Sequence, residues 1–138
     1  MSIHDARSEA KTWLRYAEED LRAAKWALQG EDVAPRHACF LCQQAAEKAV
    51  KSLLIMAGVD FPKVHDIEAL CRLLPEHLAR PISLTDPSSL TQWAVESRYP
   101  TDSLEATRED ASGALAQAEV LVGLAAVALG TPEDGNTG

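Results

Sequence analysis

The sequence predicts an all-α protein, an up-and-down antiparallel helical bundle of the four-helix-bundle type, with three long and two short helices. The first observation is that apolar residues recur at alternating three- and four-residue steps in three long segments, as on one face of a helix. The second is composition: alanine and leucine are abundant, and aromatic residues make up only 5%. Both features favour helices over sheets. A chain of 138 residues fits a single domain with one core.

The first two long helices are expected over residues 5–29 and 35–57. Their apolar seams consist of Leu14, Ala17, Leu21, Ala24 and Leu28 in the first and Cys39, Cys42, Ala46, Ala49, Leu53 and Met56 in the second. Gly30 suits a C-terminal cap, and Pro35 suits the first turn of the next helix. Gly58 is expected to end the second helix.

Two short helices are expected next, over about residues 66–74 and 87–96. Pro75 should stop the first of them, because proline cannot continue a helix. The second should begin at "TDP", since Pro87 fits the first helical position.

The third long helix is expected over about residues 107–129. It begins at "TRED", which has the pattern of a capping box with aspartate in place of glutamate. Its seam is mostly alanine, so a neighbouring helix can approach closely. We therefore expect residues 1–130 to form one domain and the polar tail, 131–138, to be disordered.

The net charge is −8, from 21 acidic and 13 basic residues. This charge argues against broad contact with a nucleic-acid backbone and disfavours DNA as a partner, although a small basic cluster still permits contact with RNA. We find no stretch that approaches the roughly 20 apolar residues of a transmembrane helix. The polar N-terminus lacks the core of a signal peptide. A cytoplasmic protein without membrane contact is therefore expected.

Three cysteines, Cys39, Cys42 and Cys71, suit a reducing compartment. Cys39 and Cys42 form a C-x-x-C within a helical pattern, with no second such motif and no histidine at zinc-ligand spacing. Buried structural thiols are therefore favoured over a metal or redox site. The sequence also has no glycine-rich phosphate loop, H-E-x-x-H or G-x-S-x-G. We expect neither a metal nor a cofactor.

Polar residues run along one side of the second helix in "FLCQQAAEKAVKSLL". Gln44, Glu47 and Lys51 are three and four residues apart, so they share a face beside the apolar seam. Their spacing favours an ordinary surface ion pair worth about 0.3–0.5 kcal/mol. The alternative is the wall of a binding site. Asp20 lies next to the seam of the first helix and is most simply a solvated carboxylate.

Two more candidates lie in connecting segments. In "SRYP", Arg98 offers a planar fork of donors for a phosphate, and Tyr99 can stack on a base or donate its hydroxyl. A structural corner explains this segment equally well. His65 lies just before a predicted helix start, where a capping or packing role is favoured over a site role.

Four segments, in order along the chain, resemble the HEPN family (higher eukaryotes and prokaryotes nucleotide-binding). They are "YAEEDLRAA", "CFLCQQAAEKAVKSLL", "GVDFPKVHDIEAL" and "ESRYP", followed by an alanine-rich last helix. The series is specific and covers nearly everything except the tail. It resembles in particular the Arg-Tyr-Pro type that is associated with minimal nucleotidyltransferases.

The resemblance implies a helical bundle with an up-and-down core, commonly a homodimer. Bacterial and archaeal members are often encoded beside a minimal nucleotidyltransferase. In some of these pairs the HEPN protein is an RNA-cleaving toxin, and the nucleotidyltransferase is the antitoxin that adenylylates one of its tyrosines.

Nuclease members carry an arginine and, four to six residues later, a histidine near the start of the last long helix. Arg98 fits the arginine, but no histidine follows it. The Arg-x4-His match at Arg72 and His77 lies in the wrong segment, with Pro75 between the two residues, and is treated as chance. Metal-independent RNA cleavage usually needs a group that exchanges protons near neutral pH, as histidine does.

We therefore expect a noncatalytic HEPN protein, a homodimer that pairs with a minimal nucleotidyltransferase and binds a nucleotide or an RNA phosphate. By the resemblance, Arg98 and Lys51 would contact the phosphate. Tyr99 and His65 would contact the base or the ribose.

Glu47 and Asp20 would orient the cations of this site, and Gln44 belongs to the same wall. We expect this wall to face Arg98 and Tyr99 across a cleft. One alternative is an RNase toxin with an altered site, silenced by its partner through modification of Tyr99. The other is a noncatalytic helical scaffold.

Overall fold

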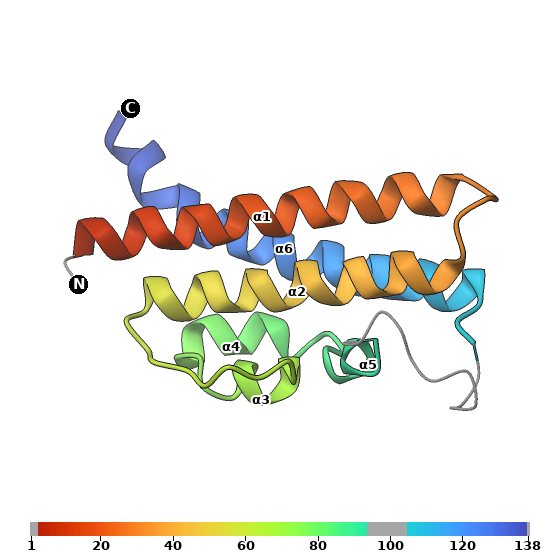
Figure 1. The fold of residues 1–138 in the computed structure, drawn as a ribbon. Coiled ribbons are helices and arrows are strands. Elements are labelled where there is room, and N and C mark those ends of the chain that lie inside the picture. The colour runs from red at the N-terminus through yellow and green to blue at the C-terminus, as the bar shows by residue number, and fades with distance from the viewer. Residues whose placement is uncertain (1–2, 94–104, 138) are drawn as a thin grey trace.

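The computed structural model describes residues 3–93 and 105–137, and every regular element in these ranges is an α-helix. The helices are α1 (Ile3–Gln29), α2 (Pro35–Met56), α3 (Ile67–Cys71), α4 (Glu76–Ile82), α5 (Ser88–Thr91) and α6 (Arg108–Thr137). The three long helices α1, α2 and α6 pack along one another, and the short helices lie on one side of α2 (Figure 1). The all-α bundle predicted from the sequence is confirmed.

The α3–α5 segment allows two of the long helices to run in the same direction. α1 runs antiparallel to α2 and α6, whereas α2 and α6 run the same way (Figure 1). The chain can return to the start of α6 because the α3–α5 segment passes back along the bundle (Figure 1). This segment therefore takes the place of a fourth helix in the up-and-down order.

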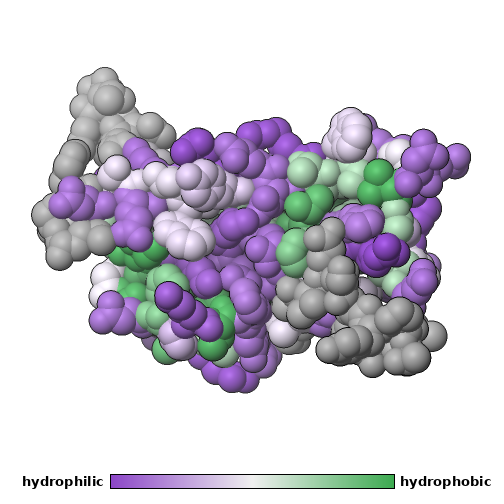
Figure 2. Space-filling view, in the orientation of Figure 1, coloured by the Kyte–Doolittle hydropathy of each residue, from purple (hydrophilic) through white to green (hydrophobic). Residues whose placement is uncertain are grey.

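The core between the long helices is built largely from small side chains. The buried alanines of these helices are Ala10, Ala17, Ala24, Ala27, Ala38, Ala45, Ala46, Ala49, Ala111, Ala114, Ala118 and Ala125. Small residues let helix backbones pack at short interaxial distances. Larger side chains, among them Leu54, Ile67, Leu70 and Leu90, fill the layer between α2 and the short helices. Hydrophilic residues cover most of the face in Figure 2, with apolar patches near both ends of the bundle.

Local signals fix several helix ends where the sequence predicted them. Pro35 occupies the first turn of α2. After α2, Gly58 has φ 74°; its N–H donates to the carbonyl of Ile55, and the N–H of Val59 donates to that of Leu54. This pair of bonds is a Schellman motif, whose left-handed position favours glycine.

The start of α6 is the predicted capping box. The N–H of Asp110 donates to Oγ1 of Thr107 at 3.0 Å, and the N–H of Thr107 donates to Oδ2 of Asp110 at 2.9 Å. Two backbone donors at the helix start are thereby satisfied.

The short helices differ from the prediction. α3 is shorter than the expected 66–74, and α4 was not predicted. Pro75 stands immediately before α4 with an extended backbone, φ −55° and ψ 150°, so it also introduces a helix. α5 ends at Thr91, whereas the predicted helix ran to residue 96, and residues 94–96 lie outside the described ranges.

The last helix also differs from the prediction. α6 continues to Thr137, although we expected the helix to end near Leu129. Extending an existing helix costs far less than nucleating one, because each further residue forms a hydrogen bond on a turn already made. A prediction from the polar composition of the last residues does not take this low cost of helix extension into account.

Arg108–Gly130 of α6 is long and apolar enough to cross a membrane, by length and composition only. From the sequence we expected no segment that approaches the length and apolar composition of a membrane span. This expectation underestimated how long and apolar α6 is. One side of the segment, including Ala118, Leu121 and Ala125, packs in the core against α1 and α2. A core helix of a bundle passes the same test of length and hydropathy.

Candidate functional site

Four polar residues meet where α2 faces the loop before α3. Gln43, Glu47 and Lys51 follow one another at four-residue steps on α2 and are only 0%, 5% and 8% exposed. His65 joins them from the loop of residues 57–66, and its side chain is 64% exposed. We call these four residues the α2 polar cluster.

Glu47 is the centre of the α2 polar cluster. Its Oε2 accepts a hydrogen bond from Nζ of Lys51 at 2.8 Å, and its Oε1 accepts one from Nε2 of Gln43 at 2.9 Å. Nδ1 of His65 lies 2.9 Å from the same Oε1. Gln43 also donates to the backbone carbonyl of His65 at 3.2 Å. A buried carboxylate is tolerated when it is paired and hydrogen-bonded, as this one is.

The surroundings of Glu47 determine its protonation state. Burial raises the pKa of the carboxyl, because it disfavours the charged form. Hydrogen bonds from Lys51, Gln43 and His65 and the positive charge of Lys51 act in the opposite direction and prevail, so the pKa of Glu47 lies below its usual value. Glu47 is therefore a carboxylate at neutral pH.

Lys51 is enclosed by Glu47 and two aromatic rings. Its Nζ lies 5.8 Å from the ring centroid of Trp13 on α1 and 5.8 Å from that of Phe61 in the 57–66 loop. Both distances are within the range of cation–π attraction. The ammonium group is thus held within the protein by Glu47 and the two rings.

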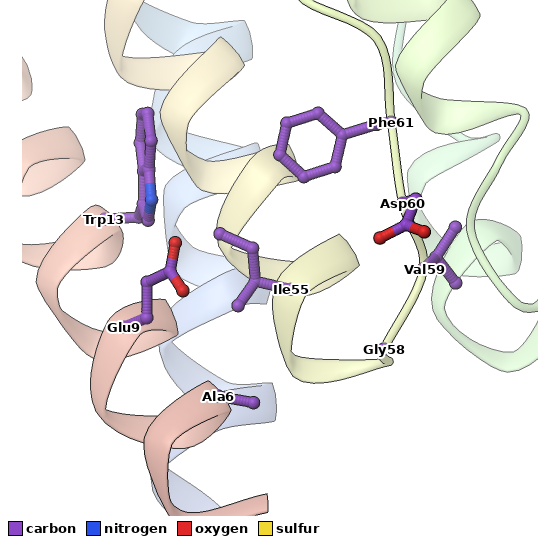
Figure 3. A pocket seen from close by; sticks show the side chains of 8 residues that line it. All are labelled: Ala6, Glu9, Trp13, Ile55, Gly58, Val59, Asp60 and Phe61. Atoms are coloured by element: carbon purple, nitrogen blue, oxygen red, sulfur yellow. The ribbon is translucent and has the colours of Figure 1, made fainter. Parts of the chain in front are cut away.

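A pocket of about 590 Å³ adjoins the α2 polar cluster. It is lined by Ala6, Glu9, Trp13, Ile55, Gly58, Val59, Asp60 and Phe61 (Figure 3). The pocket and the α2 polar cluster share the rings of Trp13 and Phe61, which line the pocket and also lie near Lys51.

The remaining predicted site residues are not members of the α2 polar cluster, although Gln44 adjoins it. Gln44 is half-buried, and its Nε2 donates to Oε1 of Gln43 at 2.7 Å. Asp20 pairs with Lys48 of α2. Arg98 and Tyr99 lie outside the described residues, and so does the cleft that we expected between them and the α2 wall.

The spacing of Glu47 and Lys51 favoured an ion pair on the surface, and this prediction of their exposure was wrong. The two residues form the predicted ion pair, but both are buried, because this side of α2 is covered by the 57–66 loop and α1. Gln43 was missed, although it lies four residues before Glu47 and therefore on the same face. No local signal links Trp13 to Phe61, since 47 residues separate them and only the fold brings them together.

The two cysteines of the C-x-x-C are buried and free, as predicted. Burial raises the pKa of Cys39 to about 11 and that of Cys42 to about 12. Thiols with such values stay protonated at neutral pH and are poor nucleophiles. They therefore serve packing.

Comparison with known proteins places the chain among HEPN proteins. The family model described as HEPN domain matches residues 10–127. No curated protein matches the chain. The crystal structure of TT1696 from Thermus thermophilus is similar with a TM-score of 0.66 and 30% identity, over 84% of this chain and 94% of that one.

A second similar structure is that of ST0689, an archaeal HEPN homologue. It has a TM-score of 0.66 and 29% identity, over 87% of this chain and 97% of that one. The family match spans most of the bundle, including the α2 polar cluster and the rings of Trp13 and Phe61. The chain therefore belongs to the HEPN domain family.

Proposed function

We propose that this HEPN protein binds a nucleotide or an RNA phosphate and acts with a minimal nucleotidyltransferase in a cytoplasmic module of the toxin–antitoxin type. The observation that carries the ligand part is the exposed imidazole of His65, held at Nδ1 by the buried carboxylate of Glu47. Among the described residues, Nε2 has no hydrogen-bond partner, and it can bond a phosphate oxygen or a ribose hydroxyl. A side chain that is already fixed loses little conformational entropy on binding.

The rest of the proposed site is supplied by residues with different roles. Arg98 is proposed to bind the phosphate through its guanidinium fork, and Tyr99 to stack on the base. Lys51 supports the site indirectly, since it keeps Glu47 charged and in place. Gln44 extends this support through its hydrogen bond to Gln43.

Thermal unfolding with and without ATP or a short single-stranded RNA tests this function. A ligand at 100 times its Kd stabilises the folded state by about 2.7 kcal/mol, which raises the Tm. We expect His65→Gln and Arg98→Ala to remove this rise. His77→Gln, which changes an exposed histidine on α4, should keep it. If no nucleotide or RNA changes the Tm of the wild type, the chain is a scaffold.

Metal-independent RNA cleavage is a second candidate function, favoured by the same Glu47–His65 pair. A carboxylate that accepts the Nδ1–H of an imidazole leaves Nε2 as a proton acceptor, as in known acid–base sites. His65 would take the proton of a ribose 2′-hydroxyl. The resulting oxygen would attack the adjacent phosphorus and release the 5′-oxygen of the next nucleotide, which takes up a proton.

This second function predicts RNA products with 2′,3′-cyclic phosphate ends in the presence of EDTA. His65→Gln should abolish cleavage, whereas His77→Gln should retain it. An RNA that remains intact with wild-type protein excludes cleavage, and cleavage that survives His65→Gln excludes this histidine as its base.

The partner proposals can be tested on the two tyrosines of the chain. If a nucleotidyltransferase adenylylates Tyr99, mass spectrometry after incubation with that enzyme and ATP will find one added adenylyl group. Tyr99→Phe should prevent the addition, and Tyr16→Phe, which changes a tyrosine that is 43% exposed on α1, should not. Modification of the Tyr99→Phe variant would contradict the assignment.

The homodimer is proposed to form through the outer face of α6. Five exposed residues without a polar side chain recur there at three- and four-residue steps: Gly113, Ala116, Val120, Gly123 and Val127. Ser112 and Glu119 are exposed beside them. Val120 is 45% exposed and Val127 68%. Light scattering should report a dimer for the wild type and a monomer for Val120→Glu. Leu84→Glu, at an 88% exposed leucine, should leave the dimer intact.

A further inference from the structure

The pocket beside the α2 polar cluster has no role in the functions proposed above. It lies between the first turns of α1, the end of α2 and the 57–66 loop (Figure 3). Its volume of about 590 Å³ falls within the usual range of small-molecule sites, about 300–1,000 Å³. Ile55 lies between the α1 side chains and those of the loop (Figure 3).

The loop side of the pocket is fixed at both ends. At one end the Schellman motif at Gly58 holds the loop against α2. At the other end His65 bonds Glu47 through its ring and Gln43 through its carbonyl. The wall between these anchors is therefore formed before any ligand arrives, which reduces the entropy cost of binding.

The aromatic side chains of the pocket converge. The ring centroids of Trp13 and Phe61 are each 5.8 Å from the same atom, Nζ of Lys51. The faces of aromatic rings carry negative potential and attract cations. These rings therefore already contact one ammonium group, inside the protein, and they also line the pocket.

The charges around the pocket are unbalanced. Glu9 and Asp60 line it, and their carboxylates point into the space between α1 and the loop (Figure 3). Within residues 3–93 and 105–137, neither carboxylate takes part in an ion pair. Lys51 does not compensate them, because it is paired with Glu47 at 2.8 Å. The pocket thus presents two negative charges beside apolar and aromatic surface.

We propose that this pocket binds a small organic cation, an ammonium or guanidinium group joined to a short apolar chain. The cationic group would lie between Glu9 and Asp60, and the chain would pack on Ile55 between Trp13 and Phe61. A phosphate is repelled by the same two carboxylates. The pocket is therefore separate from the nucleotide site proposed at His65 and does not depend on it.

Agmatine, a butyl chain with a guanidinium and an ammonium group, is a suitable probe. Trp26→Phe and Trp93→Phe together leave Trp13 as the single indole, because the chain has three tryptophans. In this background we expect agmatine to cause a saturable change in fluorescence. Glutarate and pentane-1,5-diol, which are anionic and neutral chains of similar length, should cause none.

Carboxylate variants test the two charges. Glu9→Gln and Asp60→Asn should each weaken agmatine binding about tenfold, as expected for loss of a charge-assisted contact. Glu31→Gln removes one exposed carboxylate at the other end of α1 and should leave the affinity unchanged. Melting curves check that each variant is folded, and Asp60→Asn, on an exposed loop residue, carries the test if Glu9→Gln does not fold.

Several results would overturn the proposal. These are the absence of a saturable signal at millimolar agmatine, equal binding of the neutral diol, and equal weakening by Glu31→Gln. ATP that competes with agmatine for the Trp13 signal would overturn the separation of the two sites. ATP that leaves the signal unchanged supports it, whether or not ATP binds elsewhere.

Discussion

Glu47 accepts hydrogen bonds from Lys51 and Gln43 and contacts the imidazole of His65, while only 5% of it is exposed. At the residue scale, the spacing of Glu47 and Lys51 predicted their pairing but favoured a place on the surface. The pairing depends on spacing along one helix, which can be read from the chain. Burial depends on the 57–66 loop and α1, and the spacing of residues along α2 carries no information about them. Loss of one partner of this pair is therefore expected to destabilise the protein more than it would in a surface pair.

A buried pair predicts a large effect when one partner is lost. Lys51→Met leaves the carboxylate of Glu47 buried without its cation, which should lower the free energy of unfolding by about 3–5 kcal/mol. Lys48→Met disrupts the more exposed pair with Asp20, whose side chains are 24% and 22% exposed, and should cost at most about 1 kcal/mol. Urea unfolding measures both values. Equal losses in the two variants would contradict the distinction between the two pairs.

Glu47 also predicts a dependence of stability on pH. Its pKa in the folded state lies below the unfolded value, which is about 4.3 for glutamate, so the folded state binds fewer protons there. The resulting stabilisation is present above the unfolded pKa and is lost as the pH falls through the folded pKa. Unfolding of Glu47→Gln between about pH 3 and pH 7 should therefore vary less with pH than that of the wild type.

The control for this pH dependence is Glu31→Gln, which removes an exposed carboxylate outside the α2 polar cluster. Its pH profile should follow that of the wild type. A Glu47→Gln profile parallel to the wild type would show that other carboxylates determine the acid stability.

At the element scale, helix ends with a side-chain or glycine signal were predicted, and those set by packing were not. "TRED" predicted the capping box of Thr107 and Asp110, and Gly58 predicted the end of α2. α4 carries Pro81 and follows Pro75, so its local sequence indicates a break. Its helix buries Ile82 against the rest of the protein, and such tertiary contacts routinely override local propensity.

The capping box predicts a local contribution to stability. Thr107→Ala removes the acceptor for the N–H of Asp110 and should lower the free energy of unfolding by about 1 kcal/mol. Ser112→Ala, at an exposed position of the same helix, should have no cost, because alanine is the better helix former. Chemical denaturation gives both values, and a Thr107→Ala variant as stable as Ser112→Ala would show that the box contributes nothing.

At the scale of the whole molecule, the sequence predicted that α1, α2 and α6 pack through apolar seams and that the seam of α6 is mostly alanine. It did not predict the candidate site in full. Trp13, Phe61 and His65 reach the side of α2 from a different helix and a loop, and no periodic pattern connects them. An apolar seam can be predicted from the repeat of residues within one helix. A site built from several elements depends on how those elements pack against one another, which no such repeat indicates. This difference explains why the core was predicted more completely than the site.

The small-residue seams make a prediction about the packing of the bundle. Ala24 on α1 is 1% exposed in the core between the long helices, and the adjacent Ala23 is only partly buried. Ala24→Leu inserts a larger side chain where the helices are in close contact, which should cost about 1–3 kcal/mol. Ala23→Leu adds the same atoms at a partly open position and should cost much less. Urea denaturation separates the two. Equal stability of both variants would mean that the helices can move apart freely and that the alanines do not set the distance between them.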